Sequence, residues 1–188
     1  MSPTRRLVLL QLDFSDRVYV GRVLRSDGVE FRRVLGHLPT GACVVAGLDT
    51  NGRPAGLAVG SFTSVSLDPP LVAFLVATTS TTWPEIRAWG GVSVSVLSHD
   101  QQDLCRSFAV SGGDKFANVG WTPAPRTGSP RIAGAHAWVD IELKREVVLG
   151  DHVLVVGQTL ALVTTGSSSP LVFYRGSYHG LSQTDGEG

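Results

Sequence analysis

Two clusters of hydroxyl side chains are the residues of this sequence best suited to chemistry. The first lies in the segment GSFTSVS at 60–66, and the second is TTSTT at 78–82, just ahead of a predicted helix. Hydroxyls and backbone N–H groups at the start of a helix can bind a phosphate, because the helix dipole favours negative charge there. Serine and threonine also fill strands and cap helices, so either cluster alone favours that simpler role. Two such clusters on either side of one apolar segment favour a ligand site.

Several other kinds of site are missing from the sequence. It has neither the GxGxxG turn of a dinucleotide-binding strand nor the GxxxxGK[ST] motif of a P-loop, so a nucleotide would have to bind in another way. It also lacks HExxH and GxSxG, and its five histidines are dispersed, so we expect no metal site. Cys43 and Cys105 have no ligand spacing and are interpreted as reduced core thiols of a cytoplasmic protein.

The elements that must position the two clusters are mostly strands. Apolar runs and alternation predict strands over 43–48, 55–61, 71–77, 92–96, 137–148, 153–164 and 171–175. Short helices are predicted over 28–38 behind Asp27, after Thr81 or Thr82 with Pro84 in the first turn, and after Ser98 or Asp100. This pattern favours a closed or partly closed antiparallel barrel, mainly β with a few short helices, over a parallel doubly wound sheet.

Charge is balanced overall but unevenly distributed along the chain. The 188 residues include 16 Lys+Arg and 16 Asp+Glu, and only 17% of all residues are charged. Zero net charge argues against nucleic acid as the main partner, and no apolar run approaches the ~20 residues that a membrane-spanning helix needs. Residues 54–84 contain a single charged residue, Asp68, so we expect this segment to be buried or to face a ligand.

Five short motifs, taken in order, resemble the flavin reductase family. They are PTG at 39–41, GSFTSVSLDPP at 60–70, DKF at 114–116, GDH at 150–152 and GSYH at 176–179. The family comprises the reductase components of two-component flavin-dependent monooxygenases, and the resemblance covers about residues 28–182. The serine-rich block with its LDPP continuation is the most specific part of the match.

The resemblance implies a homodimeric FMN-binding split barrel, an antiparallel split β-barrel, that uses NADH or NADPH to reduce FMN or FAD. Reduced flavin would then diffuse to a separate monooxygenase. Residues 58–60 would lie along the isoalloxazine ring, 64–66 near the ribityl chain and phosphate, and 80–82 at the phosphate. The residues that match the family's cofactor-binding positions are Thr40, Gly41, Ala58, Val59, Gly60, Ser61, Ser64, Val65, Ser66, Ser80, Thr81, Thr82, Lys115, His152, Tyr178 and His179.

The resemblance implies a more specific role for each of two residues that can carry charge. Lys115 would contact the flavin phosphate, and His152 would orient the nicotinamide, which makes it the one residue expected at the catalytic step. Without the resemblance, His152 is better interpreted as a turn histidine bonded to Asp151. The four tryptophans, Trp83, Trp89, Trp121 and Trp138, are interpreted as core or interface anchors.

The sequence leaves some choices open. A flavin-binding electron carrier that oxidises NAD(P)H poorly, or an interaction module that has lost its cofactor, fits the same residues. Arg33, Arg53 and Arg175 are all available to a 2′-phosphate, so NADH and NADPH are not distinguished. Gly60 and Ser95 depart from the family pattern near the expected flavin, so FMN and FAD are not distinguished either.

Three parts of the chain are expected to differ in organisation. Residues 1–27 lie outside the resemblance and form an N-terminal extension, either a hairpin on a dimer partner or a poorly ordered arm. Residues 28–182 form the flavin reductase-like domain. Residues 183–188 are expected to be a flexible tail.

Overall fold

A seven-stranded antiparallel sheet forms the centre of the structure, a computed structural model that describes residues 28–165 and 169–181. The expected arm at 1–27 and tail at 183–188 lie outside the described residues. The strand order is β3-β2-β6-β9-β10-β5-β4, so β3 and β4 are the two edges of an open sheet. The elements are α1 (Gly28–Leu35), β1 (Thr40–Gly41), β2 (Cys43–Leu48), β3 (Pro54–Val59), β4 (Thr63–Leu67), β5 (Pro70–Ala77), α2 (Thr82–Arg87), β6 (Gly91–Val96), α3 (Gln102–Ala109), β7 (Trp121–Pro123), β8 (Pro130–Ile132), β9 (Ala137–Leu149), β10 (His152–Thr164), β11 (Leu171–Tyr174) and β12 (Ser177–Gly180).

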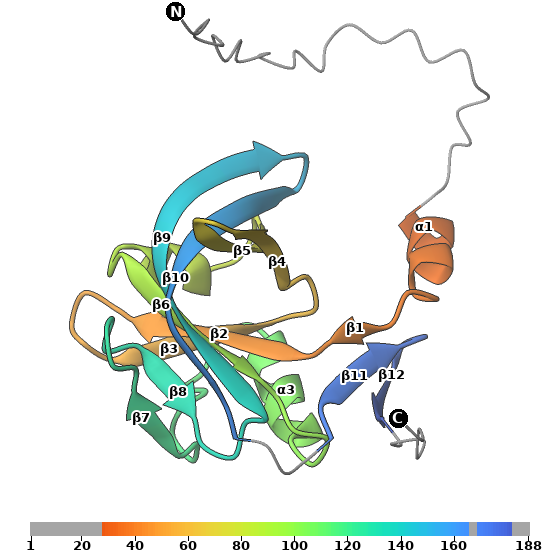
Figure 1. The fold of residues 1–188 in the computed structure, drawn as a ribbon. Helices are drawn as coiled ribbons and strands as arrows, with labels where there is room; N and C mark the ends of the chain where they lie inside the picture. Colours follow the sequence, from red (N-terminus) through yellow and green to blue (C-terminus); the bar gives the residue numbers. More distant parts are fainter. Residues whose placement is uncertain (1–27, 166–168, 182–188) are drawn as a thin grey trace, which may run out of the picture.

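The mainly β, antiparallel architecture confirms the predicted fold class. The long strands β9 and β10 pair along their whole length and bend across the molecule (Figure 1). Two register shifts, one beside Gly157, accompany this bend, as expected for bulges that increase local twist. A Cβ atom at Gly157 would overlap Ile141 of β9, so only glycine fits there without movement of the core.

Strand β2 is buried on both faces and separates two hydrophobic cores. Val45 belongs to one core, which includes Trp83 and Ile86 of α2. Val44, on the opposite face, belongs to the other core, which includes Phe108 of α3. Alternate residues of a strand point to opposite faces, so one short apolar run holds both helices against the sheet.

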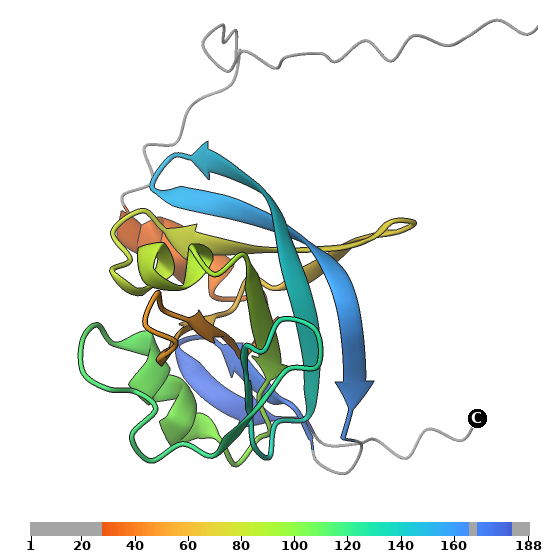
Figure 2. The same ribbon diagram turned by 90° about the vertical axis from the view of Figure 1, so that its left-hand side faces the viewer.

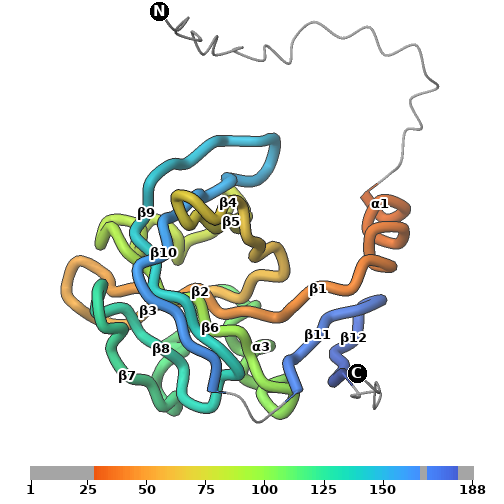
Figure 3. The backbone as a smooth tube through the Cα atoms, viewed as in Figure 1, coloured from red at the N-terminus to blue at the C-terminus, as the bar shows by residue number. Residues whose placement is uncertain are grey.

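A second, three-stranded sheet joins the two ends of the described chain. Its order is β1-β11-β12, and β1 runs antiparallel to β11 beside it (Figure 3). Arg175 and Gly176 connect β11 to β12 with φ angles of 51° and 80°. Two central residues at positive φ are typical of a type I′ hairpin turn, which explains the glycine in the GSYH motif.

The serine-rich block forms a strand that the periodicity did not predict. Its residues 63–67 make up β4, which pairs with β5 through a bulge between Ser64 and Ser66. Figure 2 shows the β4–β5 hairpin, in yellow, extending beyond the rest of the sheet. Leu67 near its tip is 94% exposed, so this edge strand has little packing of its own.

The helices lie where the sequence placed them, with different ends. α1 stops at Leu35 rather than continuing to residue 38, and none of its residues is buried. Figure 1 shows it beyond β1 and away from the seven-stranded sheet. Ser98 or Asp100 as the cap of α3 was wrong, because Gln101 precedes the helix and the Ser98 hydroxyl donates to the Gly134 carbonyl instead.

Candidate functional site

A pocket of about 480 Å³ lies along the free edge of β3. Its walls come from the end of β3, the end of β5 and the residues after it, the end of α3, and the first residue of β10. These segments lie far apart in the sequence and meet because β5 pairs with β10 while α3 packs against β3. Ten of the predicted site residues line this pocket: Thr40, Ala58, Val59, Gly60, Ser61, Ser80, Thr81, Thr82, Lys115 and His152.

Gly60 allows two chain segments to approach closely at the pocket. A Cβ atom added there would lie 2.9 Å from the Thr40 hydroxyl oxygen, closer than a carbon and an oxygen normally pack. A larger residue at position 60 would therefore require the Thr40 side chain to shift. Gly60 keeps Thr40 and the end of β3 on one wall.

Ser61 spans the gap between the edge of β3 and strand β5. Its hydroxyl oxygen accepts a hydrogen bond from the Leu75 N–H at 2.8 Å and lies 3.4 Å from the Leu75 carbonyl. The residue lines the pocket as expected, but its hydroxyl is already used to hold the backbone of β5. Ser61 therefore shapes the pocket wall through this bond.

The TTSTT segment is anchored at its first and third residues. The backbone N–H and the hydroxyl of Thr78 both donate to the Asp151 carbonyl, at 2.9 and 3.1 Å. The Ser80 hydroxyl accepts a hydrogen bond from the Trp83 N–H at 3.2 Å and so takes the capping role at the start of α2. Thr81 and Thr82 remain as the hydroxyls that line the pocket from this segment.

His152 enters the pocket from a two-residue turn. Gly150 has a φ of 63°, a conformation that glycine adopts without strain, and the turn brings β9 back as β10. His152 Nδ1 lies 2.7 Å from the Asp151 carboxylate, and this hydrogen bond lowers the pKa of Asp151. The contact confirms the turn-histidine interpretation. It also fixes the ring so that Nε2 is the nitrogen left for a ligand.

Lys115 joins the loop after α3 to the edge of β3. Its Nζ donates to the Gly56 carbonyl at 3.3 Å and to the Phe108 carbonyl at 3.2 Å. An ammonium group has three N–H donors, so one remains for a ligand in the pocket. Burial lowers the pKa of Lys115, since a charged form loses solvation there.

Gly41 and Tyr178 line a smaller pocket of about 180 Å³ that shares Thr40 and residues 58–60 with the first. The Tyr178 hydroxyl donates to Cys105 Sγ at 3.4 Å, and burial raises the pKa of Tyr178 to about 12. Burial likewise raises the pKa of Cys43 to about 12 and that of Cys105 above its ordinary value. Both thiols therefore stay protonated and unreactive at neutral pH.

The remaining predicted site residues lie elsewhere in the single chain. Ser64, Val65 and Ser66 belong to β4, and His179 belongs to β12, and none of these four lines the pockets described above. Ser95, which was expected near the flavin, is fully buried, and its hydroxyl accepts a hydrogen bond from the Ile132 N–H.

Several other pocket residues, most of them apolar, were not predicted from the sequence. They are Leu57, the segment 75–77 at the end of β5, and the segment 108–111 at the end of α3. The nearly uncharged stretch 54–84 was the signal that could have selected the first two of these. Nothing in the periodicity of α3 distinguishes its pocket-facing end from its core-facing side.

Two kinds of site are not found in the described part of the chain. Within residues 28–165 and 169–181, no group of three or more His, Cys, Asp and Glu side chains could hold a metal ion. Over the same ranges, the helices are too short or too polar to cross a bilayer.

Comparison with known proteins shows which family the chain belongs to. Residues 35–182 match the flavin reductase like domain. A flavin reductase of Pseudomonas putida is 46% identical over 162 residues, which cover 85% of this chain and 95% of the relative. The reductase subunit of a flavin-dependent monooxygenase of Rhodococcus jostii is 39% identical over 155 residues, 82% of this chain and 78% of that subunit. The NADH:FAD oxidoreductase of Streptomyces globisporus, solved with NAD and FAD fragments, superposes with a TM-score of 0.80 at 32% identity over 85% of this chain and 96% of that one. With this match and a pocket lined by its motif residues, the chain belongs to the family of flavin reductase-like domains.

Proposed function

We propose that the protein is a flavin reductase that oxidises NADH or NADPH, reduces FMN or FAD, and supplies the reduced flavin to a separate monooxygenase. The observation that carries this proposal is the meeting of ten predicted site residues from separate segments in one pocket. The functions for which the Pseudomonas, Rhodococcus and Streptomyces relatives are named support the same reaction and the same kind of partner.

The residues of the pocket suit a flavin. The wall at 57–59 and 75–77 is apolar, as a planar ring requires, while Thr81, Thr82 and Lys115 gather donors for a phosphate at one end. A bound flavin supplies the ring that accepts the hydride. The chain itself binds and orients the two rings and excludes water, and none of these tasks needs a general acid or base.

The assay that tests the function follows nicotinamide absorbance with each pairing of FMN or FAD with NADH or NADPH. Loss of absorbance in at least one pairing, at a rate proportional to protein concentration, is expected. If no pairing is oxidised, the reductase assignment is wrong; coloured protein that keeps its flavin would then indicate an electron carrier.

His152→Ala is expected to raise the KM for the reduced nicotinamide by about tenfold, the effect of losing one net hydrogen bond of about 1 kcal/mol together with ring positioning. The flavin dissociation constant should stay within about twofold, since Thr81, Thr82 and Lys115 remain. Steady-state kinetics and flavin titration measure the two quantities. A suitable control is Asp151→Asn, which keeps a side-chain oxygen beside Nδ1, and an unchanged KM in His152→Ala would refute the role.

The apolar side of α1 supports a homodimer as the functional unit. Phe31, Val34 and Leu35 lie on α1, which has no buried residue, and Leu38 follows the helix; all four are 50–67% exposed and recur at helical spacing in the sequence. Exposed apolar surface of this kind marks an interaction site, and we propose that a second copy covers it. Two buried, unpaired thiols are in keeping with a reducing compartment, which supports a cytoplasmic protein.

Phe31→Glu is expected to weaken self-association by at least about 100-fold, because the dimer would bury a carboxylate without a partner. Sedimentation velocity over a concentration series measures the dissociation constant. Arg33→Gln changes the same helix on a residue paired with Glu30 and should leave the dimer intact. Equal sedimentation of both variants and the parent protein would contradict the assignment of this surface.

A further inference from the structure

A second pocket, of about 560 Å³, adjoins the flavin pocket. It lies between the β2–β3 turn, the start of α2, the loop after α3, and β7. Thr81, Thr82 and Lys115 line both pockets, so the two cavities meet at the end where the flavin phosphate is proposed to bind. The proposed flavin and nicotinamide contacts use none of the other residues of this second pocket.

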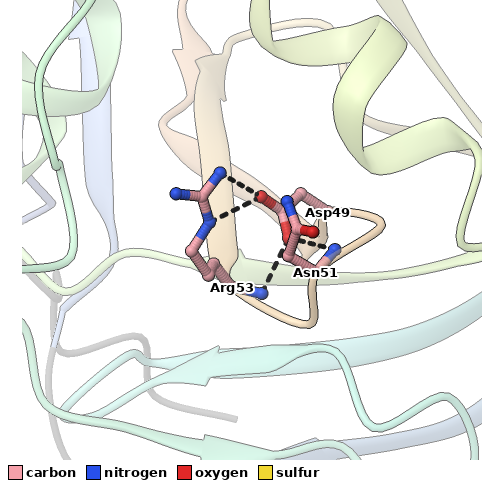
Figure 4. A network of polar contacts seen from close by, with 3 residues as sticks. All are labelled: Asp49, Asn51 and Arg53. Carbon is pink, nitrogen blue, oxygen red and sulfur yellow. Dashed lines mark hydrogen bonds and ion pairs between the residues drawn. The ribbon is translucent and has the colours of Figure 1, made fainter.

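A largely exposed guanidinium, paired with a carboxylate, lies at the rim of the second pocket. Asp49 accepts hydrogen bonds at 2.8 Å from the backbone N–H groups of Asn51 and Arg53, and its other oxygen accepts one at 2.8 Å from Arg53 Nε (Figure 4). These bonds, first of all the one from the Arg53 N–H, lower the pKa of Asp49. Arg53 Nη2 completes the ion pair at 2.8 Å, and Nη1 makes none of the contacts drawn. The side chain is thereby held in place with one nitrogen free of Asp49, and it can donate to a phosphate oxygen.

An aromatic side chain lines the same pocket. Trp121 is 36% exposed, and its ring packs edge-to-face on Phe116 with centroids 6.4 Å apart. Phe116 is buried, and its backbone N–H is held by Asp114. The indole is therefore supported by the core, in line with the expected anchor role, and keeps part of its surface toward the pocket. Such a ring can stack on a nucleobase.

We propose that the second pocket binds the adenosine 5′-phosphate half of a flavin dinucleotide, with the adenine on Trp121 and a phosphate near Arg53. The proposal rests on the proposed function, because it places the flavin half in the neighbouring pocket. Glu85 and Asp114 also line the second pocket, and carboxylate oxygens accept hydrogen bonds from ribose hydroxyls. FAD then gains contacts that FMN lacks. Of the three arginines considered for a 2′-phosphate, Arg53 is the one that lines this pocket.

The test compares FMN, FAD and AMP as ligands of the full chain. In the parent protein, FAD should bind at least about tenfold tighter than FMN, and AMP should compete with FAD while leaving FMN binding unchanged. Trp121→Ala should weaken FAD by about tenfold, the usual effect of losing one base–aromatic stack, with FMN within twofold. The matched control is Trp89→Ala, which removes a similarly exposed indole that lines neither pocket.

A reduced nicotinamide dinucleotide carries the same adenylate group. Enzyme kinetics distinguish whether the second pocket binds the adenylate of FAD or that of the nicotinamide dinucleotide. With FMN as the flavin, an unchanged KM for NADH in Trp121→Ala supports the flavin dinucleotide, while a tenfold higher KM with unaltered FAD binding overturns it. Equal affinities for FMN and FAD, with no competition by AMP, also overturn the proposal, and this measurement needs no variant. If FMN itself fails to bind, the proposed function fails instead.

Discussion

Asp140→Ala is expected to lower the free energy of unfolding by about 3 kcal/mol or more, because three donors lose one buried, charged acceptor. Asp140 is fully buried in β9. One carboxylate oxygen accepts from the backbone N–H groups of Arg126 and Thr127, at 2.8 and 3.3 Å, and the other from the Thr127 hydroxyl at 2.6 Å. The same carboxylate thus fixes the loop between β7 and β8.

Urea unfolding of Asp140→Ala and Asp140→Asn measures this effect. The asparagine keeps one carbonyl acceptor, so about half of the stability loss is expected to return. Glu142→Ala provides the control, since Glu142 sits two residues away on the same strand in an exposed pair with Lys144 and should change stability by less than about 1 kcal/mol. If the Asp140 and Glu142 alanine variants unfold at the same urea concentration, the carboxylate does not hold the loop.

Lys115→Met should weaken flavin binding between about 10- and 100-fold, the range for losing a hydrogen bond to a charged group. The ammonium group already bridges Gly56 and Phe108 at the pocket and has one donor left for a phosphate. Fluorescence titration with FMN gives the dissociation constant, and Lys144→Met, an exposed lysine on β9, should leave it within twofold. Equal flavin affinity in the Lys115 variant and the parent protein would refute the phosphate contact.

The pH dependence of the parent protein follows from the same lysine. Burial lowers the pKa of Lys115 below its ordinary 10.5, so in the free folded protein the proton leaves at a lower pH than in the unfolded chain. Flavin affinity should therefore fall as pH rises through that interval, and Lys115→Met should show no such fall. The unfolded chain binds more protons there, so this group makes the flavin-free protein more stable as pH rises. The measurement is the flavin dissociation constant between neutral pH and about 10.5, which should rise with pH in the parent protein and stay level in Lys115→Met.

Much of the fold could be predicted from the sequence because its signals are local. The apolar run of β2 and the alternation of β9 and β10 predict strands directly, and the GDH motif correctly predicted the turn that presents His152. β4 was not predicted because its hydroxyls were interpreted as a ligand cluster; Val65 and Leu67 do alternate with serines, but both are exposed, and pairing with β5 makes the segment a strand. The bulge at Val65 interrupts that pairing as well.

The site was predicted less completely because its residues compete with structural roles that only tertiary contacts reveal. The Ser61 hydroxyl is used by Leu75, that of Ser80 by Trp83, and that of Ser95 by Ile132. Each of these serines is suited to a phosphate by type alone. Because these serines are occupied, Thr81 and Thr82 are the hydroxyl donors that we propose for the flavin phosphate.

The position of the pocket on the free edge of β3 has a consequence for aggregation. An edge strand offers unpaired backbone N–H and C=O groups that can pair with a strand of another molecule. Lys115 already donates a hydrogen bond to one such carbonyl, that of Gly56. The Ser61 hydroxyl accepts a hydrogen bond from the Leu75 N–H of β5. Whatever fills the pocket also shields the edge at 57–59 from edge-to-edge association. Storage of the protein with its ligand should accordingly slow the loss of soluble material.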